Sequence, residues 1–187
     1  DLPVTTAGMT IDRQCSSGMM AIATASKSIM AGEHDIMIAG GLESISLVQN
    51  EHVNMHRVID KNLIAKHEHI YMQMLDTAEV VANRYNVTRE KQDAYALQSQ
   101  QRTAIAQQAG KYDDEIAPLT SSMGVMDRET GKISFKDVTL EKDEGNRPET
   151  NLEGLAGLKT VRENGFITAG NASQLSDGAS ASVIMAA

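Results

Sequence analysis

Residues 15–46 read CSSGMMAIATASKSIMAGEHDIMIAGGLESIS, and this stretch carries the strongest structural signal in the chain. From residue 16 to 31, apolar side chains recur at steps of three and four residues, which predicts a helix with one apolar face. Gly32 follows, as glycine often follows a helix. Residues 36–39 are continuously apolar and are closed by two glycines, which favours a strand covered on both faces.

The residues on either side extend this stretch into an α/β core. Residues 4–11 are small, β-branched or apolar, which predicts a strand before the helix. Strand, helix and strand at this spacing form a βαβ unit with a right-handed crossover. We therefore expect an α/β fold with a core segment at 1–48, an inserted segment at 49–160 and a return to the core sheet at 161–187.

The inserted segment predicts two helices. The first runs from Asp76, as its N-cap, to about residue 85, and Asn86 ends it. The second is capped by Thr88 and runs to about residue 109. Its inner face is expected to be apolar and to consist of Ala94, Leu97, Ala104 and Ile105.

Shorter elements follow these helices. Residues 114–119 predict a strand, and residues 127–132, DRETGK, predict a turn between two polar strands. Residues 152–161 predict a short helix, and the chain closes on a strand-like run, SASVIMAA. This ending, and the lack of an initiator Met, lead us to expect a piece of a longer protein.

Charge and composition exclude several classes of function. The formal net charge is −8, and no cluster of Lys and Arg supplies the basic face that a nucleic-acid binder needs. No apolar run approaches the roughly 18 residues that would span a membrane. The single cysteine excludes an internal disulfide and favours a reducing compartment, so we expect a cytoplasmic protein, with an organellar location left open.

Four of the five histidines fall within the polar stretch 49–70. His52 and His56 are four residues apart, and His67 and His69 are two apart. Such spacings occur in metal sites, but no cysteine or ordered ligand pattern accompanies them. We expect a solvated loop or an oligomer contact here, and no metal.

The only cysteine, Cys15, lies where the predicted first strand gives way to the helix. A helix N-terminus stabilises a thiolate through its free N–H groups and its dipole. Ser16 and Ser17 add hydrogen-bond donors, and Gly18 leaves room for a substrate carbonyl to approach. Cys15 could equally fill a core position, because free cysteine is among the most buried residue types. The residues alone leave both interpretations open.

A second polar stretch, TAGNASQLSDGASA, covers residues 168–181. Gly, Asn, Ser and Asp at this density favour a tight loop whose N–H groups and hydroxyls could hold polar groups of a ligand. An ordinary turn between two strands is the alternative interpretation.

Three stretches together resemble the thiolase family, in the family's order and with its gaps. Residues 15–46 resemble its nucleophile segment, which begins Cys-x-Ser-Gly and ends Ala-Gly-Gly-x-Glu-x-Met-Ser. Residues 74–85, MLDTAEVVANRY, resemble its Met-Gly-x-Thr-Ala-Glu segment. Residues 165–181, GFITAGNASQLSDGASA, resemble its Gly-x-x-Thr-Ala-Gly-Asn-Ala-Ser segment. The resemblance covers essentially the whole chain.

The resemblance implies a layered αβαβα fold, present here in part, as one half of the core with an inserted loop domain. It implies an acyl-CoA C-acyltransferase that works in ping-pong fashion through a cysteine thioester, by thiolysis of 3-ketoacyl-CoA or condensation of acetyl-CoA. Coenzyme A and acyl-CoA are then substrates, no further cofactor is expected, and the protein is a homodimer or homotetramer.

The resemblance also implies roles for five residues. Cys15 takes the acyl group as a thioester. Ser173 contacts the pantetheine arm, and Ala169 lines the nucleotide end. Arg147 lies against the CoA adenine, and Met74 faces the acyl pocket.

Three positions depart from the family pattern. Leu75 stands where Gly is common, and Gln73 where many members have His, so we expect an altered turn and an altered contact to CoA. Gly154 replaces a residue that is Ser in some members, which removes one adenine contact. These departures leave the acyl-chain length open.

Other parts of the family pattern are not found in this chain: the His of Gly-His-Pro, the second Cys of Cys-x-Gly and the Asn-Glu-Ala-Phe segment. The resemblance assigns them to the second half of the protein, so we expect these 187 residues alone to have little activity. Two alternatives remain. One is a condensing enzyme like a ketoacyl synthase, and the other is a non-catalytic carrier of CoA or lipid with the thiolase fold.

Overall fold

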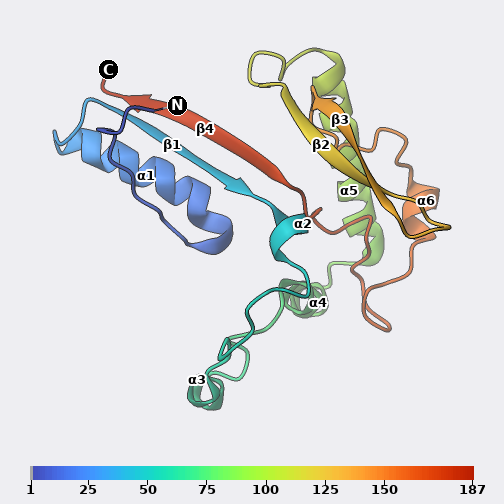
Figure 1. The fold of residues 1–187 in the computed structure, drawn as a ribbon. Coiled ribbons are helices and arrows are strands. Elements are labelled where there is room, and N and C mark those ends of the chain that lie inside the picture. The colour runs from blue at the N-terminus through green and yellow to red at the C-terminus, as the bar shows by residue number, and fades with distance from the viewer. Residues whose placement is uncertain (1) are drawn as a thin grey trace. The chain divides into compact units, whose positions relative to one another are not determined.

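A computed structural model describes residues 2–187 as a mixture of helices and strands, which confirms the α/β class (Figure 1). In chain order the elements are η1 (Gln14–Ser16), α1 (Ser17–Met30), β1 (Ile36–Glu43), α2 (Ile45–Val48), α3 (Lys61–Lys66), α4 (Met74–Tyr85), α5 (Arg89–Gln108), β2 (Leu119–Met126), β3 (Ile133–Leu140), α6 (Leu152–Ala156) and β4 (Gly178–Met185).

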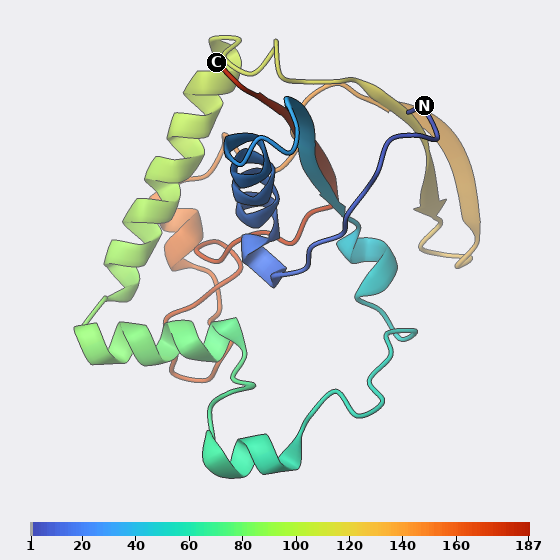
Figure 2. The ribbon, with the colours of Figure 1, turned by 90° about the vertical axis from the view of Figure 1, so that its left-hand side faces the viewer.

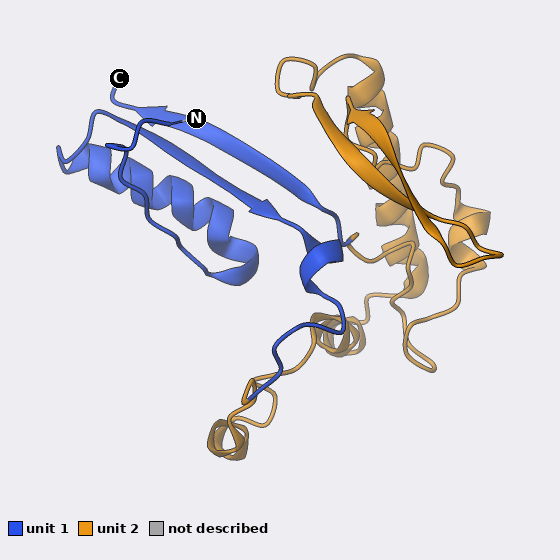
Figure 3. Ribbon diagram, viewed as in Figure 1, with its two compact units in different colours: residues 1–56, 175–187 blue, residues 57–174 orange. Residues whose placement is uncertain are grey.

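The chain forms two compact units, which Figure 3 shows in different colours. The first unit comprises residues 1–56 and 175–187, and the second comprises residues 57–174. The division expected from the sequence, into a core segment, an inserted segment and a return to the core sheet, stays a prediction.

The first unit is a two-stranded sheet with a helix against it. β1 and β4 pair antiparallel along their whole length, from Ile36 opposite Met185 to Glu43 opposite Gly178. α1 packs against both strands and runs alongside them in Figure 1. The strand predicted at the end of the chain is therefore confirmed as β4.

Three predictions about this unit are wrong. Residues 4–11 form no strand, and β1 pairs antiparallel with β4, so the described residues contain no βαβ unit at this place. A strand needs a neighbour to take up its backbone hydrogen bonds, and none pairs with residues 4–11 within the described range. β1 is also covered on one face only: Ala39 is buried, whereas Ile36 and Ile38 are 62% and 58% exposed.

In the second unit, β2 and β3 form an antiparallel hairpin around the predicted turn at 127–132. The Asp127 carboxylate fixes this turn by accepting the N–H groups of Glu129 and Thr130 at 2.8 and 2.9 Å. The strand predicted at 114–119 is wrong, because β2 begins only at Leu119. The short helix predicted after residue 151 is confirmed as α6.

The two long helices of this unit are confirmed, with one change at a cap. The Thr88 hydroxyl accepts the Lys91 N–H at the start of α5, as predicted. Asn86 ends α4 with φ 52°, in the left-handed region. The predicted cap Asp76 is wrong, because α4 begins after Gln73 and Asp76 lies in its first turn.

The predicted apolar inner face of α5 is only partly confirmed. Leu97 and Ala104 are half-buried, whereas Ala94 is exposed and Ile105 is 64% exposed. Asp93, which was not part of that prediction, is only 4% exposed. The residues that join α5 to distant segments are polar and share one side of the helix, since their spacing follows the helical period. We call them the polar stripe of α5: Arg89, Asp93, Gln100 and Gln107. Figure 2 shows the length of α5, with α6 against it.

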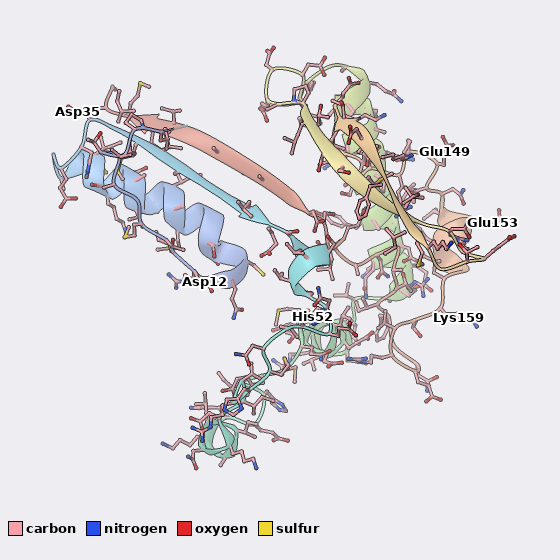
Figure 4. The ribbon with its side chains drawn as sticks, in the orientation of Figure 1. Asp12, Asp35, His52, Glu149, Glu153 and Lys159 are labelled. Carbon is pink, nitrogen blue, oxygen red and sulfur yellow. The ribbon has the colours of Figure 1, made fainter. Side chains whose placement is uncertain are left out.

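No helix among residues 2–187 is long and apolar enough to cross a membrane. Over the same range, no group of three or more His, Cys, Asp or Glu side chains is arranged to hold a metal ion. His52 follows α2 on an exposed loop (Figure 4). Its Nε2 lies 3.6 Å from Glu51 Oε1.

Candidate active site

Cys15 is exposed and lies in η1, the short 3-10 turn that leads directly into α1. In this structure the thiol is therefore not a core filler. A Cβ added to Gly18, in the first turn of α1, would meet no atom within 4 Å, so there is open space beside the turn. The sequence predicted both the helix and the position of the thiol at its start.

The backbone turns sharply just before the thiol. Gln14 has φ 49°, in the left-handed region that costs a non-glycine residue roughly 1–2 kcal/mol. The Asp12 carboxylate accepts the Gln14 N–H at 2.8 Å, and Asp12 lies at this turn in Figure 4. The Ser17 hydroxyl accepts the Arg13 N–H at 2.8 Å and donates to the Gln14 carbonyl at 2.7 Å. Side chains on both sides of Cys15 thus fix the turn.

This geometry suits a sulfur nucleophile. The N–H groups at the first turn of a helix carry partial positive charge, which favours negative charge on a sulfur placed there. Exposure lets a substrate reach the sulfur, and the hydrogen bonds of Ser17 fix the backbone turn that carries Cys15. The sequence suggested Ser17 as a hydrogen-bond donor beside the thiol, and in the structure its hydroxyl donates to the Gln14 carbonyl.

The second unit contains a concavity of about 350 Å³. Arg147 and Ala169, both expected to touch CoA, line it together with Gly154. Four parts of the chain line it: Gln100 of α5, the loop at 147–151, α6 with the residues up to Leu158, and the loop at 169–174. Glu149, which also lines the concavity, is labelled in Figure 4.

Two other predicted site residues lie outside the lining of this concavity. Ser173 is exposed and is not among the lining residues, although Ala172 and Gln174 on either side of it are. Met74, the first residue of α4, is 71% exposed and does not line it either. The structure thus brings Arg147 and Ala169 together, and does not bring Ser173 or Met74 into the same lining.

The polar side chains of the loop at 168–174 form hydrogen bonds within the protein that fix the conformation of the loop. Thr168 is fully buried, and its N–H donates to Asn171 Oδ1 at 2.8 Å. The Asn171 amide donates to the Phe166 carbonyl at 3.1 Å and to Asp93 Oδ1 at 3.0 Å. These groups are used inside the protein, so the exposed residues Ala169 and Ser173 are the ones available to a ligand on this loop.

Glu79 of α4 fixes the start of the same loop. Its carboxylate accepts the Phe166 N–H at 2.9 and 3.0 Å and the Ile167 N–H at 3.0 Å. A Cβ added to Gly165 would lie 2.5 Å from Glu79 Oε1, so this close approach requires glycine. Sequence reasoning missed this role of Glu79, which depends on a contact between segments far apart in the chain.

Gln100 of the polar stripe of α5 fixes the Arg147 segment. Its Oε1 accepts the Arg147 N–H at 2.8 Å and the Asn146 side-chain amide at 2.9 Å. The Thr150 hydroxyl donates to the Arg147 carbonyl at 2.7 Å, which closes the turn after it. The Arg147 backbone is therefore fixed, while its exposed side chain is available to a ligand.

The start of α4 carries an exposed ion pair. Arg162 donates to both carboxylate oxygens of Asp76, at 2.6 and 3.1 Å, and to Gln73 Oε1 at 3.2 Å. The hydrogen bond from the Arg162 side chain holds the pKa of Asp76 below its ordinary value. Gln73, one of the departures from the family pattern, is therefore engaged by Arg162 in this structure.

The first unit thus carries an exposed thiol at a helix start, and the second unit carries a concavity that Arg147 lines. Residues 1–187 match the family model for the thiolase N-terminal domain. The chain therefore belongs to the thiolase family.

Known members of the family cover the chain almost completely. The human peroxisomal 3-ketoacyl-CoA thiolase is 41% identical over 184 residues, which is 97% of this chain and 42% of the relative. The human mitochondrial 3-ketoacyl-CoA thiolase, solved in complex with CoA, has a TM-score of 0.71 at 35% identity over 94% of this chain and 44% of that chain. The dimeric peroxisomal thiolase of Saccharomyces cerevisiae has a TM-score of 0.76 at 29% identity, over 94% of this chain and 42% of that one.

These comparisons confirm the family and a partial thiolase α/β fold. The chain spans less than half the length of each of these three relatives.

Proposed function

We propose that the protein carrying this chain is an acyl-CoA C-acyltransferase of the thiolase type, with Cys15 as the residue that accepts the acyl group. The observation that carries this proposal is the exposed thiol on a fixed turn at the start of α1. Family membership supports it, because relatives that match almost the whole chain are named 3-ketoacyl-CoA thiolase.

In the proposed reaction the deprotonated Cys15 sulfur attacks the C3 carbonyl of a 3-ketoacyl-CoA. The C2–C3 bond breaks, its electron pair stays on C2, and protonation of C2 gives acetyl-CoA. The shortened acyl group remains on Cys15 as a thioester. The thiolate of a second CoA then attacks this thioester, and the Cys15 thiolate leaves. Condensation of two acetyl-CoA is the same sequence in reverse.

The residues of this chain take part in only some steps of the proposed reaction. The first turn of α1 stabilises the attacking and leaving sulfur, and the bonds of Ser17 and Asp12 keep the turn in place. The proton transfers require an acid and a base. The resemblance assigns them to a His and a second Cys of motifs that these 187 residues do not contain.

We propose that the concavity at Arg147 and Ala169 binds the nucleotide of CoA. A guanidinium stacks well on a flat aromatic base, and the apolar side chains of Leu155 and Leu158 line the same concavity. A relative solved in complex with CoA supports this choice of ligand. Contacts of Ser173 with pantetheine and of Met74 with the acyl chain stay predictions.

Three further properties belong to the proposal. CoA is a substrate, and no separate cofactor is proposed. The protein is a homodimer or homotetramer, which the dimeric yeast relative supports. A cytoplasmic location is proposed, although the human relative is named peroxisomal.

The test is to mix the protein with acetyl-CoA, digest it and weigh the peptide that contains Cys15. We expect a mass gain of one acetyl group, which disappears when free CoA is added and is absent in Cys15→Ala. No acetyl group on Cys15, with CoA still bound, would favour the non-catalytic carrier. The second half of the protein separates the synthase-like alternative: a His and a second Cys there would favour the thiolase, and two His would favour a synthase.

A further inference from the structure

Asp93, on the polar stripe of α5, is a buried acid that the proposed reaction does not use. It is 4% exposed and pairs with Arg89 at 2.7 Å, with both side chains largely removed from solvent. A carboxylate in such a place is costly unless its oxygens are well partnered. Oδ2 accepts from Arg89 Nε, and Oδ1 accepts from the Asn171 amide at 3.0 Å. Asp93 therefore connects α5 to the loop that forms one wall of the concavity.

Arg89 extends this connection to the opposite wall. Its Nη2 donates to the Leu155 carbonyl at 2.5 Å and to the Leu158 carbonyl at 3.2 Å. Leu155 lies in the last turn of α6, and its carbonyl also accepts the Leu158 N–H at 3.1 Å, whereas Leu158 lies two residues beyond the helix. One guanidinium thus binds Asp93 with one edge and the end of α6 with another. Leu155 and Leu158 both line the concavity.

The two walls meet with little free space. A Cβ added to Gly170, on the loop, would lie 2.5 Å from Leu155 Cδ2 and 2.5 Å from Leu158 Cδ1. Since Gly170 is also a lining residue, a small displacement of the loop away from α6 would change the shape of the concavity.

We propose that Asp93 is a positioning residue for CoA: through Arg89 and Asn171 it holds the end of α6 and the loop at 168–174 at the separation that the nucleotide requires. This inference rests on the proposed function, because it takes CoA as the ligand of the concavity. Asp93 does not touch the ligand, and its effect is confined to the binding of the nucleotide end.

The experiment compares four variants of the protein carrying this chain. Asp93→Asn removes the charge at nearly constant shape, and Asn171→Asp places a second carboxylate against Asp93. The double variant D93N/N171D again sets one amide against one carboxylate across the same contact. Asp137→Asn, an exposed Asp on β3, is the matched control.

Two substrates separate positioning from general damage. The first is acetyl-CoA, and the second is the acetyl thioester of N-acetylcysteamine, which has the reactive group but no nucleotide. For each variant the measurements are KM and kcat with acetyl-CoA, the rate of Cys15 acetylation by the short thioester, and the Kd of free CoA.

We expect each single variant to raise the Kd of CoA and the KM for acetyl-CoA about tenfold, as loss of one charge-assisted hydrogen bond predicts. The kcat and the rate with the short thioester should stay within about twofold, because Cys15 lies on another element. The double variant restores the contact between residues 93 and 171 but not the Asn171 bond to the Phe166 carbonyl, so it should recover part of the affinity. Asp137→Asn should resemble the wild type.

An unchanged Kd of CoA in Asp93→Asn would overturn the inference. So would an equal loss of activity with both thioesters, because that result indicates general damage. Failure of the proposed function looks different: the wild type would then accept no acetyl group from either thioester. Even in that case, the Kd of CoA in Asp93→Asn compared with wild type decides the positioning role.

Discussion

Replacing Glu79 by Gln should loosen residues 166–167, which lead into the loop at 168–174, while leaving the shape of the side chain nearly unchanged. The Glu79 carboxylate accepts the N–H groups of Phe166 and Ile167, at distances between 2.9 and 3.0 Å. Glutamine offers one acceptor oxygen, and its NH₂ group would face a backbone donor. A hydrogen bond to a charged group contributes about 1.5–3 kcal/mol, so the free energy of unfolding should fall by about 2–3 kcal/mol. With a urea m-value of about 1–3 kcal/mol/M, the unfolding midpoint should fall by about 1 M.

Hydrogen exchange gives the local test of this prediction. The Phe166 and Ile167 amides should lose protection by a larger factor than the Gly154 amide, which is held at 2.8 Å by Asn151. The matched control is Glu129→Gln on the exposed hairpin turn, where a change within about 0.5 kcal/mol is expected. Wild-type protection of Phe166 and Ile167 in the Glu79 variant would refute the assignment of this carboxylate as the anchor of the loop.

Three further substitutions test other parts of the structure. Arg162→Gln should remove a pH-dependent part of the stability: the Arg162 side chain lowers the pKa of Asp76 from 3.8, so the pair stabilises the fold above that pH, and the contribution is lost as the pH falls through the lowered pKa. Urea midpoints at neutral and acidic pH should therefore differ less in this variant, and an undiminished difference would contradict the prediction. Gly170→Ala should lower the free energy of unfolding by about 1–3 kcal/mol through overpacking against Leu155 and Leu158, and it should weaken CoA binding. An unchanged melting temperature would show that these two side chains move aside without cost. Ser17→Ala should slow acetylation of Cys15 by about tenfold while unfolding changes by about 1 kcal/mol or less, and a wild-type acetylation rate would rule out its role in fixing the turn.

The helices and turns of this chain could be predicted because local chemistry decides them. Thr88 supplies a cap hydroxyl, Asn86 adopts a left-handed conformation, and Asp127 folds its own turn. Strand pairing could not be predicted in the same way. β1 finds its partner at the far end of the chain, and residues 4–11 have strand character but no partner strand among the described residues.

In the candidate site, too, local features could be predicted from the sequence and contacts between distant segments could not. The position of Cys15 at the start of a helix follows from the sequence, but its exposure does not. Arg147 and Ala169 came from family resemblance, and the structure places both at one concavity. The polar stripe of α5 was not predicted, because the apolar residues of this helix were taken as its inner face. Its partners, such as Asn171 for Asp93, lie too far along the chain for a local pattern to reveal them.

The most direct test of the central claim is a single turnover of a 3-ketoacyl-CoA by the intact protein, quenched before any free CoA is added. If the exposed thiol at the start of α1 is the acyl acceptor, one acetyl-CoA is released for each shortened acyl group found on Cys15, and Cys15→Ala releases none. Acetyl-CoA release that persists in Cys15→Ala, or an acyl group bound to another residue, would contradict the account.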